Sequence, residues 1–581
     1  MNYRDKIYEI LKILEDKHLD LYFSVSKEET LKYIDEVLNK FEIKDKYDFY
    51  YVVNVIIKKI SGIYDSHTKL LFKDNSRTIP IRLKYINNKL YIIRTDAYNE
   101  DLLYSEVLKI NGVDVSKLIE EIENMTPYST KEYLISPIEV SLRTINKLKA
   151  LPSIDNSCEE YEIEVLKDNQ IIKRTLKELE SYDDLIKVNE RKNNYSYEIM
   201  DDKIYLVYNA CKEEYEGQMK EFVNQIKELS ETNNINKFIV DLRGNAGGNS
   251  DVINPLIDYL NGKEIITLID EYVFSGGRWA VFDLKNIGSK FVGTGIGTSM
   301  NCFGNISKTE MDDFILAVSN KYWYFDKDCN KENFRFAIRN EEVTEETLSN
   351  PFFIPFEEMK KHKKYFISQI FEPDYYVVNS IDAYKNNEDR QLYAAESLLD
   401  LKKGNSLEEF KNIKTPDGLM KFMDDYIIYG WIGNDLKLHV NSLDNFREQY
   451  RTSSIEDIIL TGLGTCIGQA KLIKFFFDKM GIENKLYCHR SYEIGDNSEK
   501  KIKMHCFVLF KSNDKWYHFE HSMYPMKGIH EYNSLEEALE YITSKWPKGE
   551  RQLTEIDSIP DGLTYKEFNE YVNSFDNNKT K

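Results

Sequence analysis

The clearest hydrophobic pattern in the chain surrounds residues 237–260. An apolar run, Phe238 to Val240, has the composition of a strand that is buried on both faces. A Gly-rich turn at residues 244–248 follows, and a helical pattern begins near Asn249, a residue type favoured at helix N-caps. Such a turn exposes backbone N–H groups beside a helix N-terminus, where they suit an anion or a developing oxyanion. A tight turn without chemistry is an equal alternative, and no GxxxxGK[ST] motif supports a phosphate loop.

Other regions show their own periodicities. Residues 1–60 carry apolar positions at helical spacing, and residues 79–115 read as short strands with Asn-rich and Asn-Gly turns. From about residue 195, strand and helix patterns alternate. The strands are expected at 203–208, 238–240, 264–269 and 290–293, and the helices at 215–229, 249–260 and 279–284. This alternation predicts a mainly parallel sheet with a site at the carboxyl ends of its strands.

Composition narrows the classes of partner and location. The 581 residues predict several domains, and the formal net charge of −20 argues against nucleic acid or an anionic membrane as the main partner. The seven cysteines are scattered without a CxxC pair, so no disulfide scaffold or zinc ribbon is indicated. No signal peptide and no run of 18 apolar residues occurs. We therefore expect a soluble, cytoplasmic protein that needs no cofactor.

Ser275 is the first candidate for chemistry. It follows the strand pattern at 264–269 and precedes the helical pattern that starts near Trp279, so it is either an N-cap or a nucleophile. The N-cap is the commoner role. The glycine that follows, Gly276, and the earlier turn around Gly247 favour the nucleophile, because two convergent backbone amides make an oxyanion hole. His67 lies in a short Gly-containing turn, and from that stretch alone a structural or surface histidine is the more common reading.

Several motifs in order resemble the tail-specific (C-terminal-processing) serine peptidase family, in its tricorn-like branch. They span residues 60–395 and are DSHT (65–68), INGVDV (110–115), DLRGNAGG (241–248), VFSGG (273–277), the segment 291–305, EPD (372–374) and the stretch 382–389. The resemblance implies a PDZ-like part and a ClpP/crotonase-like α/β core. It also implies that Ser275 is the nucleophile, His67 its general base, and Gly276 with Gly247 the oxyanion donors.

Three departures from the family pattern are visible. The Ser–Lys branch has a lysine where this chain has Thr298-Ser299, so His67 is the only base that matches a motif. The carboxylate that would orient His67 has no secure match, and Glu372 is a weak candidate. Ala246 replaces a glycine of the turn. A degenerate domain that binds peptides without hydrolysing them therefore stays open.

A second set of reactive residues lies near the C-terminus. Cys466 opens a helical pattern that ends at Gly481, and a helix N-terminus favours a thiolate. His505 begins a strand, and Glu520 ends the next strand of a predicted hairpin, within hydrogen-bonding reach. Together, the cysteine, the histidine and the glutamate supply a thiol nucleophile, a base and a carboxylate that orients the base. A buried cysteine with two surface polar residues is the alternative.

This second set resembles the transglutaminase-like, papain-related superfamily, with Glu520 in place of the usual Asp. The resemblance implies that Cys466, His505 and Glu520 form a catalytic triad. His518 and His521 are further polar candidates as partners. A zinc site that combines Cys506 with these histidines lacks a standard ligand spacing, so we predict no metal.

The sequence thus predicts a multidomain α/β and α+β protein: a PDZ-like part and a peptidase core, followed by a papain/transglutaminase-like domain. The predicted regions are a helical N-terminal region (1–60), a β-rich PDZ-like part (61–190), the peptidase core (191–396), a helical connector (397–450), the transglutaminase-like domain (451–550) and a polar tail (551–581). We expect a serine peptidase acting on peptides or proteins, in an unknown oligomeric state. The alternatives are a peptide-binding or regulatory protein, or a cysteine hydrolase or acyltransferase active only in the rear domain.

Overall fold

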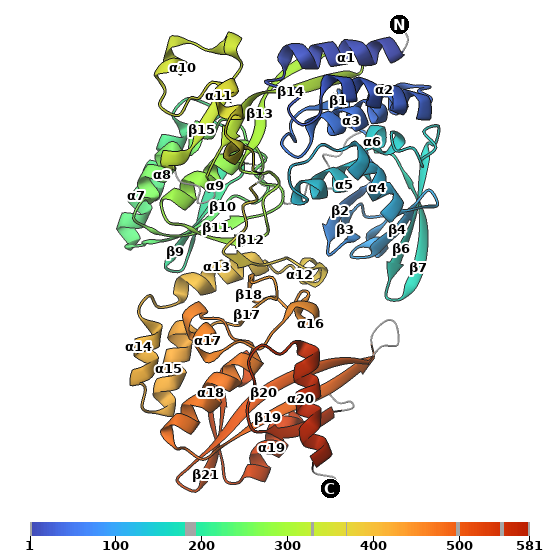
Figure 1. Cartoon of the computed structure of the whole chain (residues 1–581). Helices are drawn as coiled ribbons and strands as arrows, with labels where there is room; N and C mark the ends of the chain where they lie inside the picture. The colour runs from blue at the N-terminus through green and yellow to red at the C-terminus, as the bar shows by residue number, and fades with distance from the viewer. Residues whose placement is uncertain are drawn as a thin grey trace. The chain divides into compact units, whose positions relative to one another are not determined.

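The computed structural model describes residues 3–179, 193–326, 331–367, 369–494, 500–546 and 551–578 (Figure 1). Its contacts divide the chain into two compact units. The first comprises Met1–Pro373 and Ser380–Glu388, and the second comprises Asp374–Asn379 and Asp389–Lys581. The division falls before the boundary near residue 396 that the sequence predicts. None of the described helices is long and apolar enough to cross a membrane.

Three helices begin the first unit, in the region where the sequence predicts helices. They are α1 (Tyr3–Lys17), α2 (Lys27–Lys40) and α3 (Lys46–Ser61). Their apolar faces share one core with an antiparallel sheet of order β1-β14-β13, in which β15 also pairs with β14. The strands of this sheet are β1 (Lys69–Phe72), β13 (Cys302–Glu310), β14 (Phe314–Tyr324) and β15 (Arg335–Ile338).

The region that the sequence identifies as PDZ-like contains a six-stranded antiparallel sheet and three helices. The Asn111-Gly112 turn has two positive φ angles, 48° and 76°, as a tight hairpin requires. The strands are β2 (Ile81–Ile86), β3 (Lys89–Thr95), β4 (Glu106–Ile110), β5 (Val113–Asp114), β6 (Glu160–Lys167) and β7 (Gln170–Lys177), and the helices are α4 (Val115–Met125), α5 (Ile135–Ser141) and α6 (Ile145–Lys149). PDZ-like architecture itself stays a prediction.

A mainly parallel sheet forms the centre of the first unit, which confirms the α/β prediction. Strands β9, β10, β11 and β12 are parallel neighbours in this order, and β8 pairs antiparallel to β9. The elements are β8 (Tyr195–Met200), β9 (Lys203–Tyr208), α7 (Gln218–Asn233), β10 (Lys237–Asp241), α8 (Asn254–Leu260), β11 (Glu264–Ile269), α9 (Gly276–Asn286) and β12 (Lys290–Gly293). The Gly-rich turn follows β10, and Ser275 follows the neighbouring parallel strand β11. Both therefore lie on the side of the sheet where these strands have their carboxyl ends.

Short elements complete the first unit: α10 (Glu345–Ser349), α11 (Phe356–Lys360) and α12 (Ile381–Asn386). Brief 3-10 helices occur in both units at η1 (Glu100–Leu102), η2 (Glu132–Leu134), η3 (Ser250–Ile253), η4 (Lys331–Asn333), η5 (Asn340–Glu342), η6 (Lys363–Phe366) and η7 (Tyr524–Met526).

The second unit begins with four helices and three short strands. These are β16 (Tyr375–Tyr376), α13 (Arg390–Asp400), α14 (Ser406–Asn412), α15 (Pro416–Tyr426), β17 (Gly430–Ile432), β18 (Leu438–Val440) and α16 (Phe446–Gln449). The predicted helical connector of residues 397–450 therefore also contains strands. Its residues belong to the same core as the later elements of this unit, because Trp431 and Phe422 pack with Cys466 and Phe568.

A five-stranded antiparallel sheet of order β22-β21-β20-β19-β23 forms the rest of the second unit. The elements are α17 (Ile455–Thr461), α18 (Cys466–Met480), β19 (Asn484–Ile494), β20 (Lys500–Ser512), β21 (Lys515–Glu520), β22 (Gly528–Tyr532), α19 (Leu535–Ser544), β23 (Arg551–Ile556) and α20 (Tyr565–Asn578).

The prediction of a polar tail at residues 551–581 is wrong for residues 551–578, the part that the structure describes. Strand β23 pairs with β19, and α20 buries Phe568 and Val572 completely. These two apolar residues stand four positions apart, on one face of the helix, so a largely polar segment still has a core-facing stripe. The segment is red in Figure 1 and lies beside the sheet.

Candidate functional site

Ser275 occupies a strained turn between β11 and α9. Its φ of 51° and ψ of −116° are unusual for a residue with a side chain. It stands at the N-cap position of an 11-residue helix, yet its side chain caps no backbone amide. The N-cap reading therefore does not explain this serine. Such strain persists only where the surrounding structure enforces it, and it is a common feature of reactive residues.

The Gly-rich turn packs directly against the Ser275 turn. A Cβ atom on Gly276 would lie 2.6 Å from the Gly248 carbonyl oxygen, and one on Gly247 would lie 2.5 Å from the Gly276 nitrogen. Real Cβ atoms do not approach backbone so closely, so this contact needs glycine at both positions. Asn245 joins the two turns, because its carbonyl accepts a hydrogen bond from the Phe274 N–H (3.0 Å).

The backbone amides that remain available to bind an oxyanion in these turns are not the two that the sequence predicts. The Gly247 N–H donates to the Asn245 Oδ1 atom at 2.9 Å, so it is already used. The amides of Gly248 and Gly276 donate to no acceptor within the described parts of the chain. Gly248 therefore replaces Gly247 as the second oxyanion candidate. The sequence could not separate these adjacent glycines, because the choice depends on the Asn245 side chain.

His67 lies beside the Ser275 turn, with its ring stacked on Phe274 at a centroid distance of 4.4 Å. The side chain is buried, and neither ring nitrogen has a hydrogen-bond partner among the described residues. The Ser275 hydroxyl is therefore not bonded to His67 in this structure. Burial lowers the pKa of His67 to about 3 despite the opposing charge of Asp65, and nearby Lys69 adds to the shift. The ring is thus neutral at pH 7, as a general base must be.

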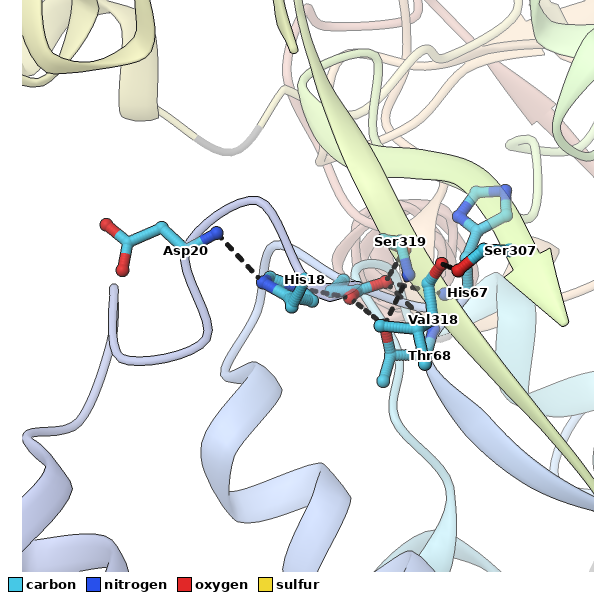
Figure 2. A network of polar contacts seen from close by, with 8 residues as sticks. His18, Asp20, His67, Thr68, Ser307, Val318 and Ser319 are labelled. Carbon is cyan, nitrogen blue, oxygen red and sulfur yellow. Dashed lines mark hydrogen bonds and ion pairs between the residues drawn. The ribbon is translucent and has the colours of Figure 1, made fainter. Parts of the chain in front are cut away.

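A buried network holds the main chain of His67 rather than its ring (Figure 2). The Asp65 Oδ1 atom accepts hydrogen bonds from the His67 N–H (2.8 Å), the Thr68 N–H (3.0 Å) and the Ser319 hydroxyl (2.9 Å). Its Oδ2 atom accepts from the Thr68 hydroxyl at 2.5 Å and from His18 Nε2 at 3.0 Å. This carboxylate has no capacity left to orient the His67 ring. No described carboxylate, Glu372 included, bonds that ring.

His18 is a part of this network that sequence reasoning missed. Its Nδ1 atom accepts a hydrogen bond from the Asp20 N–H at 3.1 Å, so the ring carries a proton on Nε2 and donates it toward Asp65. The two side chains are buried and come from positions 47 residues apart. No local pattern marks a lone histidine after a helix as the partner of a distant carboxylate.

In the second unit, Cys466 is the first residue of α18 and is buried. Its Sγ atom lies 3.7 Å from the Met504 carbonyl oxygen. His505 Nε2 and Glu520 Oε2 are 2.9 Å apart, as the predicted hairpin implies. The other Glu520 oxygen accepts hydrogen bonds from the Ser522 N–H (2.7 Å) and the Met523 N–H (3.0 Å). The structure thus brings the three predicted residues together.

The charges of this second cluster are coupled. Burial opposes the charged form of His505, but hydrogen bonds to Cys466 and Glu520 raise its pKa to about 10. Burial likewise opposes the charged form of Glu520, but its bond to His505 lowers its pKa to about 2. The cluster therefore favours an imidazolium between the Cys466 sulfur and the Glu520 carboxylate.

The other polar candidates of the second unit have different surroundings. His518 Nε2 lies 3.7 Å from Glu520, and His521 Nδ1 bonds Gln469 at 2.8 Å. Across the described residues, no group of three or more His, Cys, Asp or Glu side chains is placed to hold a metal ion.

A sequence model of peptidase family S41 matches residues 203–277, which run from β9 through the Gly-rich turn to Gly277. This match supports a serine-type peptidase for the first unit. A comparison with curated proteins found no match.

Solved structures of proteases resemble the chain weakly. Mature CPAF matches at 10% identity and a TM-score of 0.45, over 69% of this chain and 96% of its own. A putative S41 protease from Bacteroides fragilis matches at 13% and 0.31, over 63% and 96%. The photosystem II D1 C-terminal processing protease matches at 10% and 0.31, over 55% and 87%. Identities and TM-scores this low do not establish a function for the chain.

Proposed function

We propose that the first unit is a serine-type peptidase that cleaves peptides or proteins through an acyl-enzyme at Ser275. One observation carries the proposal: a strained, uncapped serine faces a glycine turn in which two backbone amides, those of Gly248 and Gly276, have no acceptor among the described residues. The family match ends at this same turn.

The reaction follows from these groups. His67 takes the proton of the Ser275 hydroxyl as the oxygen attacks the scissile carbonyl, and the Gly248 and Gly276 amides hold the resulting oxyanion. The His67 imidazolium then gives its proton to the leaving amine, and the acyl-enzyme forms. A water molecule, deprotonated by His67, then attacks the ester, and the bond to Ser275 breaks to release the acid while His67 returns the proton to the Ser275 oxygen. Because His67 and Ser275 are not bonded in the structure, substrate binding has to bring them together.

Labelling with a fluorophosphonate probe tests this proposal in the full chain. We expect covalent labelling that is lost in Ser275→Ala and strongly slowed in His67→Gln. Ser250→Ala, a serine beside the same Gly-rich turn, is the matched control and should label normally. A folded protein that the probe does not label would contradict the peptidase proposal and favour the peptide-binding alternative.

We propose a second activity for the other unit, a thiol hydrolase or acyltransferase in which Cys466 is the nucleophile. The observation that favours it is the His505–Glu520 pair at 2.9 Å beside the cysteine that begins α18. The transglutaminase-like resemblance rests on the residue pattern alone. Iodoacetamide should alkylate Cys466 rapidly at pH 7, and Cys466→Ala should abolish this reaction. Cys158, which is free and more exposed, provides the control Cys158→Ala. A slow reaction at Cys466 would contradict this proposal.

A further inference from the structure

A buried ion pair joins the six-stranded sheet to the chain segment that leads to Ser275. The Lys84 ammonium group, on β2, lies 2.7 Å from the Glu271 Oε1 atom and donates a hydrogen bond to the Tyr272 hydroxyl oxygen, also at 2.7 Å. Only 12% of the Lys84 side chain and 8% of the Glu271 side chain are exposed. Breaking a pair that is buried to this extent is costly, because it leaves a charge without a partner and away from water.

Both acceptors of this ammonium group are bound to further parts of the first unit. The Tyr272 hydroxyl donates to the Glu139 Oε2 atom at 2.6 Å, and the other oxygen of Glu139, on α5, accepts from the Tyr85 N–H at 2.8 Å. The second oxygen of Glu271 accepts a hydrogen bond from the Thr294 hydroxyl at 2.7 Å, just after β12. These contacts form one continuous polar chain from the six-stranded sheet to the parallel sheet.

The ion pair holds the middle of the segment 270–274, which directly precedes Ser275. The first residue of this segment is bound to the Gly-rich turn, because the Asp270 Oδ1 atom accepts a hydrogen bond from the Gly244 N–H at 3.0 Å. The last residue, Phe274, donates its N–H to a carbonyl oxygen of the same turn at 3.0 Å. Both ends of the segment are therefore fastened to the Gly-rich turn, and the ion pair fastens its middle to β2.

The two partners of the pair depend on each other for their charge. Burial opposes the charged forms of both, but the attraction between them outweighs burial, so the pKa of Lys84 is raised and the pKa of Glu271 is lowered. Both side chains are therefore charged at pH 7. Without the ammonium group, Glu271 would be a buried carboxylate that lacks its cation, and the segment that carries it would have to shift to solvate it.

We propose that Lys84 is a positioning residue for the Ser275 nucleophile, and that its ion pair with Glu271 sets the conformation of the segment 270–274 and so the place of the Ser275 hydroxyl. This inference rests on the proposed function of Ser275. The strained backbone of Ser275 requires support from the surrounding structure, and the ion pair supplies part of it. Lys84 acts through this segment and does not itself touch the reacting atoms.

Fluorophosphonate labelling of the full chain at increasing probe concentrations separates probe binding (KI) from the chemical step (kinact). We expect Lys84→Met to lower kinact roughly a hundredfold and to leave KI unchanged, because a displacement of about 1 Å at a reacting group has an effect of this size. Lys84→Arg keeps the positive charge and should retain most of the rate. Lys89→Met is the matched control, since Lys89 lies on the neighbouring strand β3 and forms an exposed pair with Glu106. It should label as the parent does.

A double variant tests whether the two charged residues act through their contact. If they do, Lys84→Met combined with Glu271→Gln should label no more slowly than Lys84→Met alone, because the same interaction has already been removed. Additive slowing in the double variant would overturn the proposal.

Hydrogen exchange gives a readout that is independent of the peptidase function. The amides of residues 270–274 should exchange faster in Lys84→Met than in the parent or in Lys89→Met. If the parent is not labelled at Ser275, the peptidase proposal fails, and exchange alone judges whether Lys84 holds the segment. If Lys84→Met does not fold, Tyr272→Phe removes only the hydroxyl that joins Lys84 to Glu139. It should lower kinact roughly tenfold, as the loss of one hydrogen bond does.

The outcomes that would overturn the proposal are equally specific. A folded Lys84→Met, or in its place Tyr272→Phe, that labels with the parent's kinact would show that the contact does not position Ser275. A change in KI alone would assign Lys84 to probe binding. Slowing in Lys84→Arg equal to that in Lys84→Met would exclude the role of the charge. Unchanged exchange over residues 270–274 would exclude the effect on the segment.

Discussion

Replacing Gly248 by alanine is the most direct test of the proposed oxyanion site. Gly248 has a φ of +134°, a conformation that alanine rarely adopts. The new Cβ atom would lie 2.3 Å from the Cys211 carbonyl oxygen and 3.0 Å from its carbon. Both atoms belong to backbone, and hydrogen bonds hold the two segments together at 2.8 Å (Asn249 N–H to Cys211 O) and 3.1 Å (Cys211 N–H to Gly247 O). The turn must therefore move, and the Gly248 amide moves with it.

The substitution has two separate effects, the loss of an oxyanion donor and an unfavourable backbone conformation. The loss of one oxyanion donor slows acyl transfer by roughly 10²–10³-fold, or about 2.7–4 kcal/mol. The unfavourable φ costs about 1–3 kcal/mol of stability. Gly262→Ala separates the two parts. Gly262 has a φ of +82°, but a Cβ atom there meets nothing within 4 Å. It should lower stability and leave the chemistry intact.

The assay is the second-order rate constant for fluorophosphonate labelling of Ser275, measured beside the thermal unfolding of each variant. We expect Gly248→Ala to stay folded at the assay temperature and to label at least roughly a hundredfold more slowly than the parent, the lower bound for a lost donor. Gly262→Ala should label at the parent's rate. Labelling of folded Gly248→Ala at the parent's rate would refute the assignment of this amide. Equal slowing in both glycine variants would attribute the effect to general strain.

Three further outcomes are expected. Asp65→Asn removes the charged acceptor that orders its own loop, so hydrogen exchange over residues 61–72 should accelerate at pH 7, and unchanged exchange would contradict the network. Burial opposes the charged form of Asp65, but the hydrogen bonds from His18 and Thr68 and the nearby positive charge together outweigh it and lower the pKa of this carboxyl in the folded chain, so its contribution to stability should disappear as the pH falls below about 4. Fluorophosphonate labelling should hold its rate from about pH 8 to about pH 5 and fall only near the pKa of His67, about 3, because protonation removes the base; a fall centred near the ordinary histidine pKa of about 6.5 would oppose this. Glu520→Gln should slow iodoacetamide labelling of Cys466 roughly tenfold at about pH 6.5, since the imidazolium loses its carboxylate, and an unchanged rate would exclude that role.

Features with local causes could be predicted from the sequence. The apolar run before the Gly-rich turn is strand β10, and it is buried as a strand in the middle of a parallel sheet must be. Helix α18 begins at Cys466 and ends before Gly481, which has the left-handed conformation that glycine adopts after a helix, with a φ of 67°. In each case the residues that determine the element stand within a few positions of it.

Features that depend on distant segments could not be predicted. The antiparallel pairing of β23 with β19 joins residues that are far apart in the chain, and it turns an apparently polar tail into part of a sheet. The His18–Asp65 bond has the same origin. The sequence identifies residue types that are able to react, whereas the packing decides which of them keep an unused hydrogen-bonding group. The predicted cytoplasmic location stays a prediction.

The two candidate sites differ in how far their bases are already engaged. His505 is held between a carboxylate and a thiol group, so its hydrogen-bonding capacity is largely satisfied before any substrate arrives. His67 is buried, its ring nitrogens have no partner among the described residues, and an unpaired buried polar group costs about 1–3 kcal/mol. That cost is relieved when the ring reaches the Ser275 hydroxyl or a substrate. Since the cost falls only on the uncomplexed state, the His67 arrangement favours a site that closes on binding. If one site fails to react in a labelling experiment, that result therefore gives no information on whether the other site is reactive.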